Sequence, residues 1–230
     1  MKTKNILPLL LLALFTISCV PKKIIREDIE WTNFWWTHEP DVTKPRVLFI
    51  GNSILQGYFP FVSGKLNGKV NCDRYSSSRS IEDPALFKET KMAMAKYNHK
   101  VIHFNNGLHG WHLTNGQYEK ELRKYVKFLK SNKSKDCVLI FSLTTPFPSE
   151  KPGQKLHPEK NQVVLDRNQI ARKIMEENNI PVIDLYSLME PELESFSHSK
   201  GDVHYKEKGY EMMADLISEK INSIIEKKDL

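Results

Sequence analysis

The sequence predicts an α/β fold, a three-layer α/β/α sandwich around a parallel five-stranded sheet. Short apolar runs that suit buried strands alternate with longer stretches of helical apolar spacing. Such alternation implies right-handed crossovers and a parallel sheet. The predicted strands span residues 47–50, 70–75, 101–105, 137–143 and 181–186, and the predicted helices span 57–66, 84–98, 115–131, 162–178 and 207–227.

The first predicted strand is Val47 to Ile50, an uninterrupted apolar run that suits a strand buried on both faces. It breaks at Gly51, after which the chain turns into a helix. Apolar residues three or four positions apart indicate helices. In chain order these residues are Tyr58, Phe59, Phe61 and Val62, then Tyr118, Leu122, Tyr125, Val126 and Leu129, then Val164, Ile170, Ile174 and Met175, and finally Met213, Leu216, Ile217, Ile221 and Ile224. The irregular, proline-containing stretch 145–160 follows the fourth strand and is expected to form one wall of a site.

The amino-terminal leader predicts export. It carries two lysines, an apolar run from Ile6 to Ile17, and then Ser18-Cys19. The run is too short for a permanent membrane span and is typical of a secretory signal. Cys19 after a small residue resembles the bacterial lipobox, in which this cysteine carries the lipid. We therefore expect a membrane-anchored lipoprotein, periplasmic or at the cell surface, with simple secretion as the alternative.

Length and composition fit one exported domain. We divide the 230 residues into a signal peptide (1–18), a lipid-anchored linker with an aromatic arm (19–44) and one α/β domain (45–230). The net charge of +6 includes the lysines of the leader, so it is only weak support for nucleic-acid binding. No nucleic-acid partner is expected. Cys72 and Cys137 are as compatible with buried thiols as with a disulfide.

Ser53 is the candidate nucleophile. It follows the first strand at the edge where open α/β sheets bind their ligands, although a polar residue there also suits a helix N-cap. A hydroxyl needs a base to take its proton, and His204, just before the last helix, supplies one. Asp202 supplies a carboxylate to orient that histidine. Ser, Asp, His is one of several chain orders in which this geometry recurs.

In the segments around these three residues, the domain 45–230 resembles the SGNH or GDSL-type hydrolases. Gly51-Asn52-Ser53-Ile54 is similar to their first block, Gly-Asp-Ser-Leu, and Asp202-Val203-His204 to their last. That last block normally reads Asp-x-x-His, so Asp202 stands one residue too close to His204. The resemblance implies the predicted fold, which is flavodoxin-like, and an esterase that needs no cofactor.

The same resemblance implies an oxyanion hole. Its donors are expected to be the backbone amides of Ser53 and Ser78 together with a side chain from His109 or Asn105. The third block is usually Gly-x-Asn-Asp, and a match without a gap places His109 where the family has asparagine. Ser78 falls nearest to the glycine of the second block. Asn105 stays the alternative donor.

Asn52 and Trp111 are the expected substrate contacts. Residues 31–40 hold three of the four tryptophans, which favours an arm clamped onto the domain over a sugar-binding platform. Three histidines between residues 103 and 112 raise the possibility of a metal. Carboxylate and cysteine partners at ligand spacing are missing, so we expect no metal.

The family includes esterases of acetylated sugars, lipids and thioesters. An exported lipoprotein with aromatic residues favours a serine esterase that removes O-acyl groups, most simply O-acetyl groups, from carbohydrate. The alternatives are a lipid esterase or lysophospholipase of the same fold and a non-catalytic glycan-binding lipoprotein.

Overall fold

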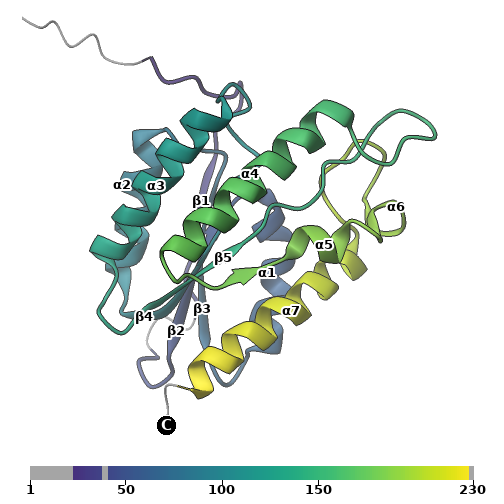
Figure 1. Ribbon diagram of the computed structural model, residues 1–230. Helices are drawn as coiled ribbons and strands as arrows, with labels where there is room; N and C mark the ends of the chain where they lie inside the picture. The colour runs from purple at the N-terminus through teal and green to yellow at the C-terminus, as the bar shows by residue number, and fades with distance from the viewer. Residues whose placement is uncertain (1–22, 38–40, 228–230) are drawn as a thin grey trace, which may run out of the picture.

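The computed structural model describes residues 23–37 and 41–227 (Figure 1). Strands and helices alternate along most of this part of the chain. In chain order the elements are β1 (Thr32–Trp35), β2 (Arg46–Gly51), α1 (Ser53–Lys65), β3 (Asn71–Ser77), α2 (Pro84–Lys96), β4 (His99–Phe104), α3 (Asn115–Asn132), β5 (Val138–Ser142), α4 (Pro158–Glu177), β6 (Val182–Ile183), α5 (Leu185–Met189), α6 (Leu193–Phe196) and α7 (Glu207–Glu226).

The sheet has six strands in the order β1-β3-β2-β4-β5-β6. The last five in this order run parallel, which confirms the predicted parallel core. The prediction of five strands was wrong by one, because β1 adds to the edge of β3 in antiparallel register. Phe34 of β1 stacks on Tyr75 of β3 with ring centroids 5.0 Å apart. The aromatic arm is therefore a strand of the sheet, which favours the clamp over the sugar platform.

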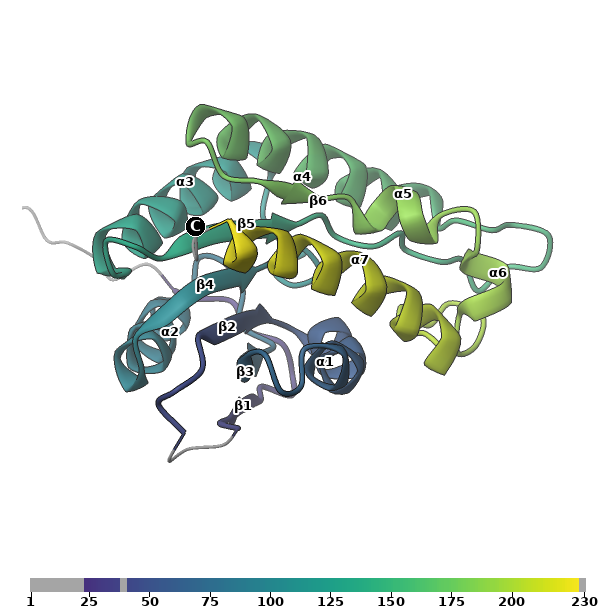
Figure 2. The same ribbon diagram turned by 90° about the horizontal axis from the view of Figure 1, so that it is seen from below.

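Helices cover both faces of the sheet, as the predicted sandwich requires (Figure 2). Successive side chains of a strand point to opposite faces, so β2 contributes to two cores. Val47 and Phe49 pack with residues of α1, α5 and α7. Leu48 and Ile50 pack with residues of α2, α3 and α4. Both cores are fully buried, and they hold β2 at the centre of the sheet.

Helix boundaries differ from the prediction where side chains cap them. The helix predicted over 57–66 begins at Ser53, because the side chain of Asn52 accepts a hydrogen bond from the N–H of Ile54. The strand predicted over 181–186 ends at Ile183, because Asp184 caps the short helix α5. The helix predicted from residue 162 begins at Pro158, a residue type that suits the first helical turn.

The leader and Cys19 lie outside the described residues. Among the helices at residues 23–37 and 41–227, none is both long and apolar enough to cross a bilayer. Cys72 and Cys137 are both buried as thiols, and no disulfide joins them.

Candidate active site

Ser53 lies where β2 passes into α1, at the carboxyl edge of the sheet. It is the first residue of the helix and only partly buried. The first N–H groups of a helix have no acceptor within it and carry the positive end of the helix dipole. The local structure therefore presents the hydroxyl and backbone amide of Ser53 beside a region that favours negative charge.

Ser53, His204 and Asp202 form a continuous hydrogen-bonded relay. His204 Nε2 is 2.8 Å from Ser53 Oγ, and His204 Nδ1 is 2.6 Å from Asp202 Oδ1. A carboxylate only accepts, so Nδ1 donates to Asp202, and Nε2 of the neutral ring accepts from the serine hydroxyl. The structure brings together three side chains whose first and last members are 151 residues apart.

The short Asp-x-His spacing is accommodated by a tight turn. Asp202 Oδ1 accepts both the ring Nδ1–H and the backbone N–H of His204, the latter at 2.9 Å. Burial raises the pKa of Asp202, but these two hydrogen bonds outweigh it and leave the pKa below its usual value. The carboxylate is therefore ionised at neutral pH, as an orienting group must be. Gly201 begins the turn at φ 75°, where a side chain would press on Glu150.

The relay opens into a pocket of 290 Å³. The acidic and basic members of its lining are Glu27, His109, Asp202 and His204. Its apolar walls come from Leu108, Trp111, Phe147 and Val203. Trp111 and Phe147 meet edge to face with ring centroids 5.3 Å apart. The placement of Trp111 fits its predicted substrate contact, and Phe147 comes from the 145–160 stretch expected to form a wall.

His109 lies in the same pocket as Ser53. Its Nδ1 is 2.7 Å from a carboxylate oxygen of Glu27, and its side chain is 14% exposed. Its Nε2 is buried and has no hydrogen-bond partner within the described part of the chain. A buried polar atom without a partner is costly, which makes Nε2 a candidate for contact with a bound molecule.

Two predicted oxyanion donors are already bonded. The backbone N–H of Ser78 donates to the carbonyl of Trp31, just before β1, so the prediction for Ser78 was wrong. The amide nitrogen of Asn105 donates to Ser142 O at 2.8 Å and to Thr144 Oγ1 at 3.1 Å, which uses both of its hydrogens. Asn105 is thus a structural residue that joins the ends of β4 and β5. Ser53 N–H and His109 stay as the donor candidates.

Asn52 was expected to contact substrate, and in the described part of the chain its buried Nδ2, next to Ser53, has no hydrogen-bond partner. It is 4% exposed, and its side-chain oxygen caps α1. The residue therefore fixes the start of the helix that presents Ser53.

Arg167 of α4 holds the loop that carries His109. This buried guanidinium donates to the carbonyls of Gly107, His109 and Gly110 at 2.6 to 2.9 Å. It also lies over the ring of Trp111, 5.4 Å from the centroid. Burial lowers its pKa from the usual value. No local pattern in the sequence marks this residue, since it lies within an ordinary helical pattern.

The three histidines between 103 and 112 have separate partners. His103 is buried against Ser142, and burial lowers its pKa to about 3. His112 is bonded to Glu82. Across residues 23–37 and 41–227, no group of three histidine, cysteine or acidic side chains is arranged to hold a metal ion.

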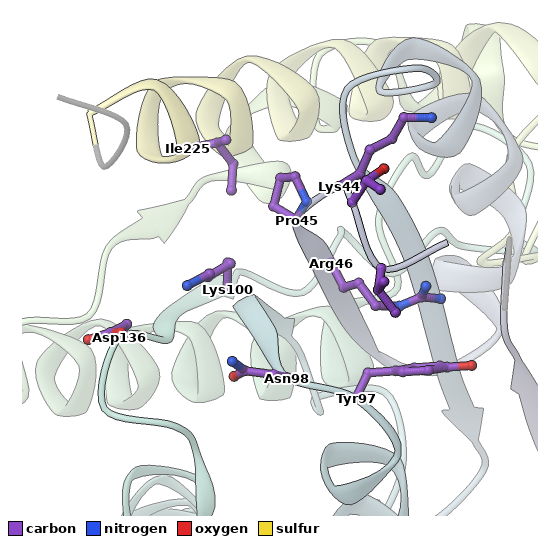
Figure 3. Close-up of a pocket in the computed structure, with 10 residues that line it drawn as sticks. Lys44, Pro45, Arg46, Tyr97, Asn98, Lys100, Asp136 and Ile225 are labelled. Atoms are coloured by element: carbon purple, nitrogen blue, oxygen red, sulfur yellow. The ribbon is translucent and has the colours of Figure 1, made fainter. Parts of the chain in front are cut away.

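A larger pocket of 660 Å³ lies at the opposite edge of the sheet (Figure 3). It is lined by the starts of β2 and β4 and the segment before β5, including Arg46, Lys100 and Asp136. Parallel sheets bind ligands at the carboxyl ends of their strands, which is the other edge. Its lining also holds no hydroxyl paired with an imidazole. The smaller pocket at Ser53 is the candidate active site.

A hydroxyl, an imidazole and a carboxylate in sequence at this edge of the sheet are the arrangement found in serine hydrolases. Residues 111–217 match the family model described as GDSL-like lipase/acylhydrolase. The expected resemblance to SGNH or GDSL-type hydrolases is thereby confirmed over this part of the chain. No curated protein matches the chain.

Solved structures of the same fold include a GDSL-like lipase from Bacteroides thetaiotaomicron, with 18% identity and a TM-score of 0.60 over 80% of this chain and 91% of that one. An acetylxylan esterase from Geobacillus stearothermophilus has 15% identity and a TM-score of 0.61 over 77% of this chain and 94% of that one. Another acetyl xylan esterase has 18% identity and a TM-score of 0.62 over 76% of this chain and 99% of that one. The family model supports a carboxylic ester hydrolase, and these neighbours show the fold that carries it.

Proposed function

We propose that the protein is a serine esterase that removes short O-acyl groups, in the first place O-acetyl groups, from carbohydrate. The observation that carries the proposal is the relay from Asp202 through His204 to Ser53 at the mouth of a small pocket with aromatic walls. The comparison with acetylxylan esterases supports the substrate class, and a serine-to-alanine exchange defines a catalytic mutant of one of them.

Ester hydrolysis proceeds in two nucleophilic attacks, the first by Ser53 and the second by water. His204 Nε2 takes the proton of Ser53 as its oxygen attacks the ester carbonyl, and the protonated ring returns a proton to the departing sugar hydroxyl. Water then attacks the acyl-enzyme in the same way, which releases the acid and frees Ser53. Asp202 keeps the proton on Nδ1 and stabilises the imidazolium. The Ser53 N–H and His109 are the proposed donors to the oxyanion.

The size of the pocket favours a short acyl group. At 290 Å³ it lies at the lower limit of ligand pockets, which run from about 300 to 1,000 Å³. Trp111 and Phe147 offer apolar faces on which a sugar ring can stack. A lipid esterase would require a longer apolar groove, and a glycan-binding protein would gain nothing from an ordered relay.

The test is hydrolysis of p-nitrophenyl acetate, butyrate and octanoate, and release of acetate from acetylated xylo-oligosaccharides. We expect activity to fall with chain length, and Ser53→Ala to lose at least about 1,000-fold in kcat. Preference for octanoate would favour the lipid esterase. Binding of the oligosaccharide with equal, background turnover by wild type and Ser53→Ala would favour the non-catalytic lipoprotein and contradict the proposal.

We also propose that Cys19 bears a lipid and that the enzyme works outside the cytoplasm on a membrane surface. The basic and apolar leader before Cys19 supports this.

A further inference from the structure

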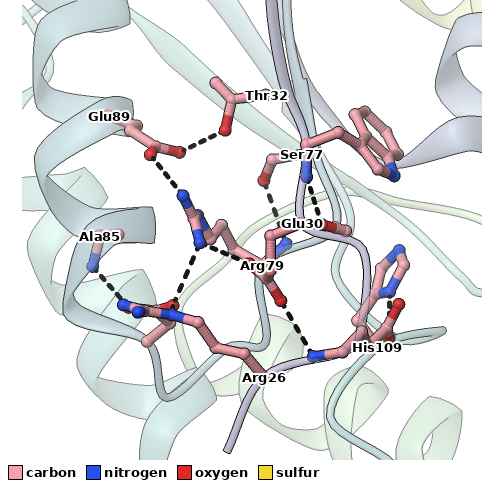
Figure 4. A network of polar contacts seen from close by, with 12 residues as sticks. Arg26, Glu30, Thr32, Ser77, Arg79, Ala85, Glu89 and His109 are labelled. Atoms are coloured by element: carbon pink, nitrogen blue, oxygen red, sulfur yellow. Dashed lines mark hydrogen bonds and ion pairs between the residues drawn. The ribbon is translucent and has the colours of Figure 1, made fainter. Parts of the chain in front are cut away.

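The amino-terminal arm, residues 23–36, reaches the candidate active site. Glu27 lines the pocket of Ser53 and His204, although it lies 82 residues before its partner His109. Figure 4 shows this arm beside the loop of His109 and the start of α2. The arm therefore contributes a charged side chain to a pocket that is otherwise built by the ends of the central strands and the loop before α7.

The arm is anchored independently of Glu27. Arg26 binds the carboxylate of Asp83 at 2.8 and 3.2 Å. Arg79 pairs with Glu30, and Thr32 donates to Glu89 at 3.1 Å (Figure 4). The β1–β3 ladder follows immediately. Removal of the Glu27 carboxylate alone should leave the arm in place, so its effect on chemistry can be measured separately.

The contact with Glu27 decides which nitrogen of His109 carries a proton. An ionised carboxylate accepts but cannot donate, so Nδ1 is the protonated nitrogen of this pair. In the neutral ring, the buried Nε2 is then a bare acceptor. Nε2 donates to an oxyanion only when both ring nitrogens are protonated. An asparagine, by contrast, donates at any pH.

We propose that Glu27 is a positioning residue that holds His109 with Nδ1 protonated, so that His109 stabilises the oxyanion only as the imidazolium. The inference rests on the proposed esterase function. The charged groups that face His109 are Glu27 from the arm, Asp202 and His204 from the loop before α7, and Arg167 from α4, which binds the backbone carbonyl of His109. Among these, Glu27 is the side chain bonded to the ring.

The proposal requires two different protonation states in one pocket. His204 must be neutral to act as base, whereas His109 must carry protons on both ring nitrogens to donate from Nε2. In Glu27→Gln the amide can donate to Nδ1, which places the proton of the neutral ring on Nε2. Glu27→Gln and His109→Asn should therefore share a pH profile of kcat that differs from the wild-type profile.

The decisive measurement is a double-mutant cycle on acetate ester hydrolysis. Glu27→Ala should lower kcat on the order of 10-fold, a part of the 100- to 1,000-fold that loss of an oxyanion donor costs. In the His109→Asn background the same change should alter kcat by less than about 2-fold, because its target is gone. Thr32→Val, which removes an arm contact away from the pocket, is the matched control and should match wild type. An equal loss of kcat from Glu27→Ala in both backgrounds would show that Glu27 does not act through His109. That result would overturn the proposal.

A second readout does not depend on activity. Long-range ¹H–¹⁵N NMR of histidine-labelled protein reports the protonation of each ring nitrogen, and His109→Asn assigns the signal. We expect a protonated Nδ1 in wild type and a shift of the proton to Nε2 in Glu27→Gln. Identical spectra would overturn the inference. The expected spectra without ester hydrolysis would instead contradict the proposed function and leave the pairing established.

Discussion

Gly57 of α1 lies directly against the ring of Tyr210 in α7: a methyl group on Gly57 would meet ring atoms at 2.0 to 2.5 Å. This close approach joins the helix that begins at Ser53 to the helix that follows His204. The approach is part of the packed core between α1 and α7, which fixes the two halves of the relay to each other.

Replacement of Gly57 by alanine should destabilise the protein. We expect a loss of about 1–3 kcal/mol in the free energy of unfolding, since the Tyr210 ring must shift in a packed core. Gly64 on the same helix has open space and is the matched control, and Gly64→Ala should gain about 0.5–1 kcal/mol. Urea denaturation of both variants decides the matter, and equal stabilities would contradict the packing.

Asp202→Asn should impair catalysis without unfolding the protein. An asparagine can present its NH₂ group to Nδ1, which stabilises the tautomer of His204 that cannot accept the proton of Ser53. We expect kcat to fall by about 100- to 10,000-fold with an unchanged melting temperature. Activity within a few-fold of wild type would show that Asp202 does not orient His204.

Arg167→Met should loosen the loop that carries His109 and Trp111. Three carbonyls would lose their donor, and each unsatisfied buried group costs about 1–3 kcal/mol. We therefore expect at least about 3 kcal/mol of destabilisation. The control is Arg172→Met on the same helix, where a half-exposed ion pair with Asp184 should be worth less than about 1 kcal/mol. Similar melting temperatures for the two variants would refute this role.

Asp73 should make stability depend on pH at the acid end. Burial raises its pKa, but hydrogen bonds from His99 and Arg46 outweigh this and lower it. The folded pKa is below the unfolded one, so the stabilisation is present above about pH 4 and is lost as the pH falls through the folded value. Asp73→Asn should flatten this acid limb and cost about 3–5 kcal/mol at pH 7, because Arg46 is left buried without its carboxylate. Urea denaturation between pH 3 and 7 measures both effects, and an unchanged acid limb in Asp73→Asn would show that other carboxylates set it.

The proposed lipid on Cys19 is tested by labelling cells with a fatty-acid analogue. We expect label on the wild type and none on Cys19→Ala, because the thiol is the attachment point. Equal labelling of the two proteins would end the proposal.

The parallel core was predictable because its signals are local. Each buried strand and each long helix shows its own apolar spacing, and Ser53 and His204 stand at element boundaries that the spacing reveals. Strand β1 was missed because four residues with two aromatics do not show that they will pair with β3. That pairing is also why Ser78 was misjudged, since its N–H is taken by the segment leading into β1.

Glu27 was missed for a related reason. A glutamate in a polar stretch carries no mark of its partner 82 residues away. Arg167 is likewise defined by carbonyls of a distant loop. The sequence reveals the reactive side chains and the alternation of strands and helices. The side chains that orient the reactive groups, by contrast, are identified only by contacts made in the folded chain.

With the proposed lipid on Cys19, the place of Glu27 in the pocket would limit how far the catalytic opening can lie from the membrane. Glu27 lies eight positions after Cys19, and a fully extended chain spans at most about 3.5 Å per residue, or roughly 28 Å in all. A lipid on Cys19 would keep the catalytic opening within that distance of the bilayer. Such an enzyme would deacetylate chains that arrive at the envelope, rather than search the surrounding medium for them.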